Sequence, residues 1–206
     1  MKTFLRVFYR LLYHQFAFTY DLVSAAVSFN RWNDWVRSVI PLLRGQSILE
    51  IGHGPGHLQK LLIHQGRNII GLDESAQMGR IARRRTGPTS QLTRGLSQSL
   101  PFADASFETI VSTFPAEYIT DPRTVAEVKR CLRSGGQLVI LPVAWPKNRF
   151  LTWLFKVTGE APATAHEVIM AQFQRPYAQA GFETEAQTVE VTSGTLLLLI
   201  AKKPAS

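Results

Sequence analysis

Residues Ser47–Leu58 read SILEIGHGPGHL, and this stretch decides the fold. The run Ile48–Ile51 is apolar except for Glu50, three glycines follow at alternate positions, and Leu58 begins a helix-like pattern. Glycine allows a positive φ and lets a ligand come close to the backbone, because it has no Cβ. The helix that follows offers free N–H groups and the positive end of its dipole. A buried strand that ends in such a turn and continues as a helix predicts a nucleotide-cofactor site.

The composition fits one α/β domain with a proper core, since the chain has 206 residues, of which 45% are apolar and 18% charged. The formal charge of +8, from 23 basic and 15 acidic residues, has two interpretations. It indicates either an anionic partner, membrane lipid or nucleic acid, or a basic protein without such a partner. The single cysteine, Cys131, excludes an internal disulfide framework and fits a reducing cytoplasm.

The N-terminal segment 2–17 has the pattern of an amphipathic helix, with Lys2, Arg6 and Arg10 on one stripe and aromatic and leucine side chains on the other. Either its apolar face packs on its own domain or it lies in a membrane interface. No apolar run approaches the roughly 18–20 residues that span a bilayer. Arg6 and Arg10 also interrupt the hydrophobic region that a signal peptide needs. We therefore expect a cytoplasmic protein that is able to lie peripherally on a membrane without crossing it.

Apolar runs and helical patterns alternate along the rest of the chain. The residues Trp32, Trp35, Val36, Val39 and Ile40 repeat at helical spacing and are expected to pack on a sheet. Strands are predicted at 47–51, 68–75 with its end at Asp73, 90–96, 108–113 and 137–145. Helices are predicted at 57–65, 76–85, 122–136 and 163–180.

Glycines mark the ends of two of these elements. The helix 122–136 is expected to be closed by its two terminal glycines. The runs 182–191 and 195–203 are joined by Thr192-Ser193-Gly194 and predict a hairpin, so the last strand runs antiparallel to its neighbour. The predicted fold class is therefore α/β: a doubly wound, seven-stranded, mostly parallel sheet of Rossmann-like type, with an antiparallel C-terminal hairpin and helices on both faces.

Both dinucleotide-binding and methyl-donor-binding folds use a glycine turn. Three details of this sequence distinguish between the two classes. The spacing is G-x-G-x-G rather than G-x-G-x-x-G, Glu50 precedes the first glycine by two residues, and the chain ends in an antiparallel hairpin. Together with LPFADASFETI (100–110) and VKRCLRSGGQLVI (128–140), these features resemble the class I S-adenosylmethionine-dependent methyltransferases. The resemblance covers Tyr20–Lys203 and implies an enzyme that binds S-adenosyl-L-methionine.

The resemblance places the cofactor around the glycine turn. It implies that Glu50, Gly52, Gly54 and Gly56 cradle the methionine part and that Asp73 binds the ribose. A carboxylate at a strand end can accept two hydrogen bonds from a ribose diol. Asp73 is alternatively the N-cap of the helix that follows, a role that can coexist with ribose binding. Glu50 is alternatively a structural acid that holds the N–H groups of the loop.

The adenine end of the predicted site departs from the family pattern. The family usually has an acid after the third strand that bonds the adenine amine, whereas Leu96 stands there in this chain. We expect the adenine to be held instead by the Ser97 backbone and by apolar contact with Leu96 and Met78, with weaker or less selective binding. His53 and Glu74 complete the predicted set of cofactor-binding residues.

A dedicated catalytic residue is not required, because methyl transfer from a sulfonium depends largely on positioning and desolvation. A carbon or oxygen acceptor usually also needs a base. The candidates near the predicted site are Tyr20, His53, Glu117 and Tyr118. His53 is alternatively a loop residue that points to solvent.

The segment FTYDLVSAAVSFNRW (18–32) resembles quinone-biosynthesis and bacterial phospholipid methyltransferases. In both, a Tyr-Asp pair lies in a helix that closes over the cofactor, so Tyr20 is the expected lid contact. The alternative is a buried tyrosine with Asp21 on the surface.

The resemblance implies a single methyltransferase domain, 1–206, in four parts. These are an N-terminal helical lid, 1–45, a cofactor-binding core, 46–145, a substrate-side insertion, 146–162, and a C-terminal helix and hairpin, 163–206. The insertion is aromatic and basic, and its side chains are expected to wall an apolar pocket or to touch lipid.

These features predict methyl transfer to a small, lipophilic or lipid-like acceptor. Residues 2–17 and 146–156 are the expected sites of peripheral membrane contact. A nucleic-acid (RNA) methyltransferase is an alternative suggested by the charge, although no appended RNA-binding module is visible. A second alternative is a non-catalytic cofactor-binding protein on the same fold, since Leu96 replaces the usual acid and no clear base is present. The glycine spacing disfavours a nicotinamide-dependent oxidoreductase, and no metal site is predicted.

Overall fold

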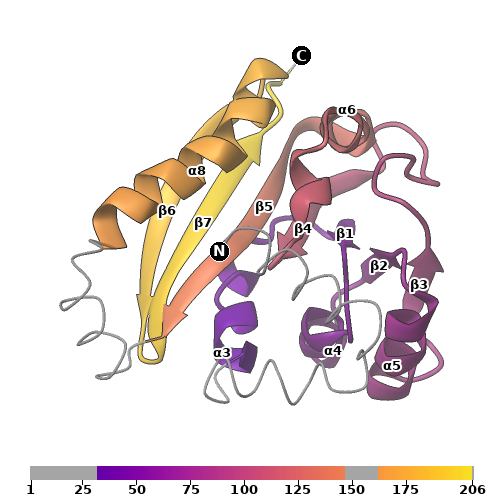
Figure 1. Ribbon diagram of the computed structural model, residues 1–206. Helices are drawn as coiled ribbons and strands as arrows, with labels where there is room; N and C mark the ends of the chain where they lie inside the picture. Colours follow the sequence, from indigo (N-terminus) through magenta and orange to yellow (C-terminus); the bar gives the residue numbers. More distant parts are fainter. Residues whose placement is uncertain (1–31, 147–161, 206) are drawn as a thin grey trace.

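A seven-stranded sheet forms the centre of the described structure, a computed structural model that describes residues 32–146 and 162–205 (Figure 1). Its strand order is β3-β2-β1-β4-β5-β7-β6. The strands are β1 (Ile48–Ile51), β2 (Ile69–Asp73), β3 (Gln91–Arg94), β4 (Phe107–Thr113), β5 (Leu132–Pro146), β6 (Glu183–Val191) and β7 (Gly194–Lys202).

The strand directions confirm the predicted fold class. β1 pairs in parallel with β2 and β4, and the parallel pairing extends outward to β3 on one side and β5 on the other. β7 runs antiparallel to both β5 and β6, as the predicted C-terminal hairpin requires. The order changes direction between β1 and β4, which is the place where ligands bind in open α/β sheets.

Helices cover both faces of the sheet (Figure 1). One face carries α3, η2, α4 and α5, and the other carries η3, α6 and α8. The helices are α3 (Trp32–Arg37), η2 (Ile40–Leu42), α4 (His57–His64), α5 (Ala76–Thr86), η3 (Glu117–Thr120), α6 (Pro122–Cys131) and α8 (Pro162–Gln179).

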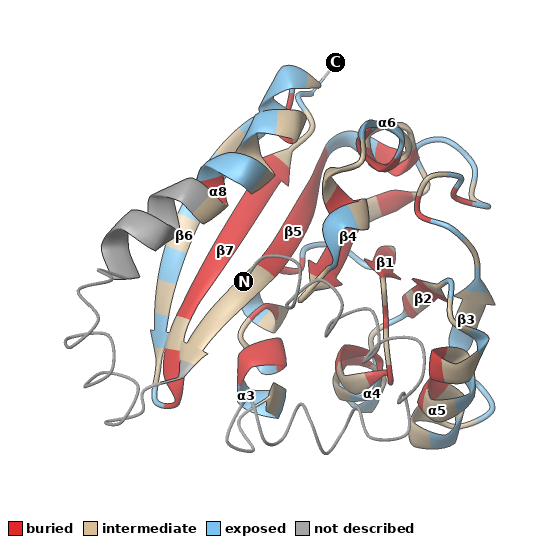
Figure 2. Cartoon of the chain, in the orientation of Figure 1, coloured by how far each residue is buried: buried red, intermediate tan, exposed pale blue. Residues whose placement is uncertain are grey.

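The two helical layers divide the buried side chains into two cores. Ile48 packs with α3 and α4, whereas the next residue, Leu49, points to the opposite core with α6 and α8. All four residues of β1 are buried, as expected for a central parallel strand with both faces covered. Figure 2 shows the burial concentrated in β1, β4, β5 and β7.

The tryptophan-rich stretch before β1 packs on the sheet as predicted. Trp35, Val36 and Val39 are at most 2% exposed and belong to the same core as Ile48. The Trp35 indole N–H donates to Ser193 Oγ at 3.1 Å, which connects α3 to the turn of the C-terminal hairpin. This contact satisfies the polar edge of a buried indole.

The prediction of a helix over 122–136 is wrong at its C-terminal end. α6 ends at Cys131, and β5 begins directly at Leu132, which pairs with Phe107. The pairing then shifts register before Gln137 meets Thr109, so the intervening residues form a bulge. Gly135, with φ +72°, serves this bulge and not a helix cap.

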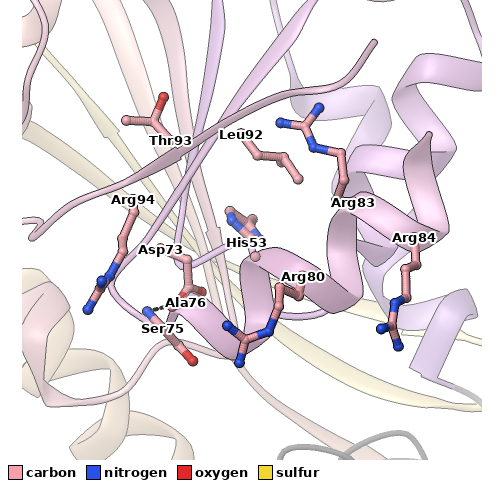
Figure 3. A pocket seen from close by; sticks show the side chains of 11 residues that line it. His53, Asp73, Ser75, Ala76, Arg80, Arg83, Arg84, Leu92, Thr93 and Arg94 are labelled. Carbon is pink, nitrogen blue, oxygen red and sulfur yellow. Dashed lines mark hydrogen bonds between the residues drawn. The ribbon is translucent and has the colours of Figure 1, made fainter. Parts of the chain in front are cut away.

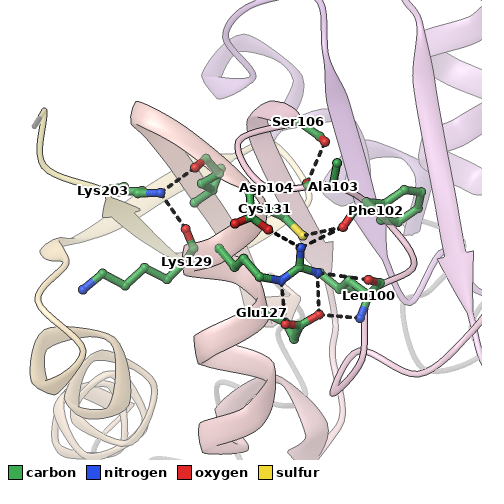
Figure 4. Close-up of polar contacts among 11 residues, drawn as sticks. Leu100, Phe102, Ala103, Asp104, Ser106, Glu127, Lys129, Cys131 and Lys203 are labelled. Carbon is green, nitrogen blue, oxygen red and sulfur yellow. Dashed lines mark hydrogen bonds and ion pairs between the residues drawn. The ribbon is translucent and has the colours of Figure 1, made fainter.

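Arg130 of α6 connects the helix to the segment that enters β4, of which Leu100, Phe102 and Asp104 are labelled in Figure 4. Its guanidinium donates to the carbonyl oxygens of Leu100 and Phe102 at 3.1 and 2.8 Å. It also forms ion pairs with Asp104 at 2.7 Å and Glu127 at 2.8 Å. The hydrogen bonds to Glu127 and Asp104 raise the pKa of Arg130 above its usual value, against the opposing effect of burial. These contacts hold the LPFADASF segment against the helix of the VKRCLRSGG segment.

Some predicted features lie outside the described residues. They include the helix at 2–17, the lid residue Tyr20 and nearly all of the 146–162 insertion. Among the described helices, none has the length and apolar character required to cross a membrane.

Candidate functional site

The predicted site lies where β1, β2 and β4 end side by side. The turn after β1 carries Gly52, Gly54 and Gly56, with φ values of +74°, +51° and +82°. All three lie in the left-handed region, which residues with a Cβ rarely adopt. The sequence prediction that this turn requires glycine is therefore consistent with the backbone at each position.

Gly54 is held at both of its backbone groups. Its N–H donates to Asp73 Oδ2 at 2.8 Å, and its carbonyl lies 2.7 Å from His53 Nδ1. Because a carbonyl oxygen only accepts, the hydrogen of the neutral imidazole must lie on Nδ1. The turn is thus fixed in shape by one side chain from β2 and one from within the turn itself.

His53 is buried, with 4% of its surface exposed, so the alternative of a solvent-facing loop residue is wrong. Its ring folds over Gly71 of β2, where a Cβ would lie 3.0 Å from His53 Cδ2. Burial lowers the pKa of His53, and the negative charge of Asp73 opposes this effect. The neutral ring therefore supports the turn from beneath.

Asp73 lies at the end of β2, as predicted, and both of its carboxylate oxygens accept backbone N–H groups. Oδ2 accepts from Gly54, and Oδ1 accepts from Ser75 at 2.8 Å. The N-cap of α5 is Ser75, whose hydroxyl accepts from the Met78 N–H at 3.2 Å, so the N-cap alternative for Asp73 is wrong. Since a carboxylate has about four acceptor positions, two remain for a ligand diol.

Glu50 is buried within β1 and accepts a hydrogen bond from Gln59 Nε2 of α4 at 2.8 Å. Its carboxylate therefore bonds a helix side chain, and no described loop N–H donates to it. Burial raises the pKa of Glu50 to about 8, with the Gln59 hydrogen bond opposing the rise and the Asp73 charge adding to it. The buried Gln59 Oε1 has no hydrogen-bond partner among the described residues.

Tyr118 of η3 is a catalytic candidate whose hydroxyl lies against the glycine turn from outside it. A Cβ built on Gly52 would overlap the Tyr118 hydroxyl oxygen. That hydroxyl is 3.3 Å from Ser112 Oγ and 3.4 Å from the Ile51 carbonyl oxygen. Glu117, the preceding residue, is exposed. The structure thus brings Tyr118, and not Glu117, to the ends of β1 and β4.

Three residues of this region escaped the sequence analysis. Ser112 is buried in β4 and donates to the Ile51 carbonyl at 2.7 Å, and Gln59 binds Glu50. Phe114, just after β4, has φ +51°, which a non-glycine residue adopts only under strain. Ser112 and Gln59 are polar residues inside an apolar strand and an apolar helix face, and that pattern was the available signal. No sequence feature indicated the backbone of Phe114.

An aromatic cluster flanks the end of β4. The Phe114 ring lies 4.2 Å from the Trp32 ring and 6.2 Å from the Trp35 ring, measured between centroids. The Phe114 N–H donates to the Leu141 carbonyl at 2.7 Å, which holds the strained residue on β5. The cluster forms an apolar wall on the α3 side of the strand ends.

The residues predicted to hold adenine differ in how far they are exposed and in which of their groups are available to a ligand. Leu96 is 53% exposed in the segment after β3, whereas Met78 is 2% exposed in α5. The Ser97 hydroxyl is buried and hydrogen-bonded to Thr124 Oγ1 at 3.0 Å, which leaves only its backbone for a ligand. Glu74 is exposed, and its carbonyl accepts from the Arg94 side chain at 3.0 Å.

A cavity of about 470 Å³ opens beside Asp73 and His53 (Figure 3). It lies between α5 and β3, and its lining includes four arginines. Neither the glycines of the turn nor Leu96 and Ser97 line it. Within 32–146 and 162–205, no group of three or more metal-binding side chains is placed to hold a metal ion.

Comparisons with known proteins identify the domain. Residues 49–140 match a family model described as a methyltransferase domain. The chain is 29% identical over 160 residues to a demethylmenaquinone methyltransferase of Symbiobacterium thermophilum, a match that covers 72% of this chain and 64% of that protein. A demethylmenaquinone methyltransferase of Thermotoga maritima is 31% identical over 147 residues, with 68% and 64% covered.

The chain therefore spans just under two thirds of the length of these curated relatives. A solved structure from Methanococcus maripaludis superposes with a TM-score of 0.63 at 17% identity, and the match covers 92% of each chain. At that identity the likeness establishes the fold alone.

Proposed function

Because the chain belongs to the class I S-adenosylmethionine-dependent methyltransferase family, we propose that it transfers a methyl group from S-adenosyl-L-methionine to a small lipophilic acceptor. The observation that carries the proposal is the position of Asp73 at the end of β2. Its carboxylate accepts a hydrogen bond from the Gly54 N–H and still has acceptor positions for a diol. The same carboxylate thus shapes the turn and faces the place where a ribose would bind.

The residues present fit the cofactor. A Cβ built on Gly54 would meet nothing within 4 Å, so the turn leaves open space above this residue. Gly52, Gly54 and Gly56 would hold the methionine part, with Glu50 behind them and Asp73 on the ribose. When bound, S-adenosylmethionine supplies a methyl group on a positively charged sulfur.

The chain's own side chains would position the acceptor and exclude water. The Tyr118 hydroxyl lies against Gly52 and within reach of Ser112, so it presents a hydrogen-bonding group at the ends of β1 and β4. We assign Tyr118 the role of orienting a polar atom of the acceptor. The wall of Trp32 and Phe114 on the α3 side would contact its apolar part.

The relatives support an electron-rich aromatic acceptor, since both are demethylmenaquinone methyltransferases. A methyl group on a cationic sulfur is an electrophile, so the acceptor must donate an electron pair to it. A reduced naphthoquinone ring does so, and its flat apolar rings are able to pack against the aromatic side chains of the wall.

The test is methyl transfer from S-adenosylmethionine with a deuterated methyl group to a reduced demethylated naphthoquinone, followed by mass spectrometry. We expect a labelled product with the wild-type chain and a loss of at least about tenfold in Asp73→Asn, since a hydrogen bond to a charged group is removed. Asp104→Asn removes an exposed carboxylate near the start of β4 and should leave the rate unchanged. Failure to methylate any quinol, phenol or lipid acceptor, with S-adenosylhomocysteine still bound, would reduce the chain to a binding protein.

A further inference from the structure

The cavity between α5 and β3 contains a set of positive charges that the proposed methyl transfer does not use (Figure 3). Arg80, Arg83 and Arg84 come from α5, and Arg94 comes from β3. The spacing of the first three, i, i+3 and i+4, puts them on one face of the helix. Like charges at this spacing repel one another, so a bound anion would stabilise the arrangement.

Two of these guanidiniums have no partner among the described residues. Neither Arg80 nor Arg84 forms a hydrogen bond or an ion pair with any residue that the structure describes. Arg83 differs, because it donates to the Pro88 carbonyl at 2.9 Å and to the Ser90 hydroxyl at 3.0 Å and so holds the loop before β3. Arg94 donates to Glu74 through Nε, which leaves its two terminal nitrogens for a ligand.

The acid in the cavity lining does not neutralise these arginines. Asp73 is the single carboxylate among the lining residues, and its oxygens accept from the Gly54 and Ser75 N–H groups. The remaining lining is small or uncharged, with the hydroxyls of Ser75 and Thr93 as further hydrogen-bonding groups. The described part of the cavity therefore has several cationic donors without a described partner, against one carboxylate that already accepts two backbone N–H groups.

This set of donors does not match the methyl donor. S-adenosylmethionine carries positive charges on sulfur and nitrogen against one carboxylate, and its predicted contacts at Gly52, Gly54 and Leu96 do not line the cavity. Guanidiniums in contrast bind phosphate oxygens with paired, charge-assisted hydrogen bonds. A volume of about 470 Å³ is that of a small-molecule site, large enough for a phosphate with an attached organic group.

We propose that the cavity between α5 and β3 binds a phosphate group, held by Arg80, Arg84 and the free nitrogens of Arg94. The phosphate belongs either to a soluble phosphorylated molecule or to the headgroup of an anionic phospholipid. Because Asp73 borders both this cavity and the glycine turn, the bound phosphate lies next to the ribose end of the predicted cofactor site.

The first experiment titrates the full chain with inorganic pyrophosphate by calorimetry at constant ionic strength, without any S-adenosyl compound. We expect saturable binding of one pyrophosphate per chain. Arg80→Gln combined with Arg84→Gln should weaken it by about tenfold or more, because two charge-assisted contacts are lost. The matched control, Arg37→Gln with Lys60→Gln, removes two exposed charges on α3 and α4 and should change the affinity by less than about twofold.

The second arm identifies the source of the phosphate. The same three proteins, namely the wild type, the Arg80/Arg84 variant and the Arg37/Lys60 control, are sedimented with phosphatidylcholine vesicles, with and without phosphatidylglycerol. Binding of pyrophosphate in solution supports a soluble ligand, whereas binding only to phosphatidylglycerol vesicles, lost in the Arg80/Arg84 variant and kept in the control, supports a lipid headgroup. Absence of both, or an equal loss in the control, would overturn the proposal. Neither arm depends on methyl transfer, so its result stands whether or not the chain binds S-adenosylhomocysteine.

Discussion

Gly54 shows how single residues shape the turn after β1. Its N–H is bound by Asp73 and its carbonyl by His53, so both backbone polar groups of this residue are fixed before any ligand arrives. His53 can lie beneath the turn because Gly71 on β2 has no side chain there. A preorganised turn binds a ligand without first paying the conformational entropy of ordering itself.

Glu50 should make the stability of the chain depend on pH. Its pKa is about 8 in the folded chain against an ordinary value of 4.5, so between these pH values the folded chain keeps a proton that the unfolded chain has released. The free energy of unfolding must then fall as the pH rises through this window, by at most about 1.4 kcal/mol per pH unit.

Glu50→Gln removes this ionisation and keeps an oxygen that accepts from Gln59. We expect its free energy of unfolding, measured in urea, to gain on that of the wild type as the pH rises from 4.5 towards 8. Glu185→Gln, on the exposed face of β6, should show no such trend. A difference between Glu50→Gln and wild type that stays constant with pH would contradict the assignment of a buried, neutral carboxyl group.

Gly52 and Gly54 form a matched pair for testing the contact with Tyr118. Both have a positive φ, so an alanine at either position costs about 1–2 kcal/mol in backbone strain. Only at Gly52 would the new methyl group also meet the Tyr118 hydroxyl. Gly52→Ala should therefore lower the free energy of unfolding more than Gly54→Ala does.

Tyr118→Phe provides the decisive background for this comparison. Without the hydroxyl, the additional cost of Gly52→Ala should largely disappear, and the cost of Gly54→Ala should not change. The wild type, the three single variants and the two double variants with Tyr118→Phe form two double-mutant cycles that urea denaturation can measure. Equal costs for the two alanines in the wild-type background would show that Tyr118 does not pack on the turn.

At the level of elements, α6 and the segment before β4 are stabilised together by Arg130. Arg130→Gln loses the contacts to the Leu100 and Phe102 carbonyls and the ion pairs with Asp104 and Glu127 (Figure 4). Because the side chain is 32% exposed, we expect a loss of only about 1–3 kcal/mol in the free energy of unfolding.

Arg123→Gln is the matched control for this change. Arg123 lies on the same helix and pairs with Asp121, but its side chain is 75% exposed, so its removal should have little effect on thermal or urea unfolding. Similar losses for Arg123→Gln and Arg130→Gln would show that Arg130 acts only as a surface charge.

The elements also show which predictions the sequence could support. The strand–turn–helix around Gly52, the strand ending at Asp73 and the terminal hairpin were predicted correctly, because apolar runs bounded by glycines have few other structures available. The end of α6 was predicted wrongly, because Gly135 adopts a positive φ in a β5 bulge just as it would in a helix cap. The choice between them depends on Leu132 pairing with Phe107, which is a contact distant in sequence.

The candidate site likewise contains residues that the sequence could locate and residues whose placement it could not predict. Asp73 could be located because its place in the motif fixes the end of β2. The burial of His53 could not be predicted, since it depends on the space above Gly71, beside Gln59 of α4 and Leu92 of β3. Tyr118 could be named only as one of four candidates, because the sequence does not show that η3 brings its hydroxyl back onto the turn.

At the scale of the whole molecule, the predicted cofactor site and the arginine-lined cavity lie next to each other at different positions along the sheet. The glycine turn, Asp73 and Tyr118 gather at the carboxyl ends of the central strands, and the arginine-lined cavity lies towards the β3 edge. The excess of positive charge in the chain, +8 in total, is therefore in part concentrated next to the predicted cofactor site.

The central claim is that the turn and Asp73 bind the methyl donor, and calorimetric titration with S-adenosylhomocysteine tests it most directly. The account predicts saturable binding by the wild type and by Asp104→Asn, and binding weakened by about tenfold or more in Asp73→Asn, since one charged acceptor is lost. No heat of binding at millimolar ligand from a wild-type chain that circular dichroism shows to be folded would contradict it.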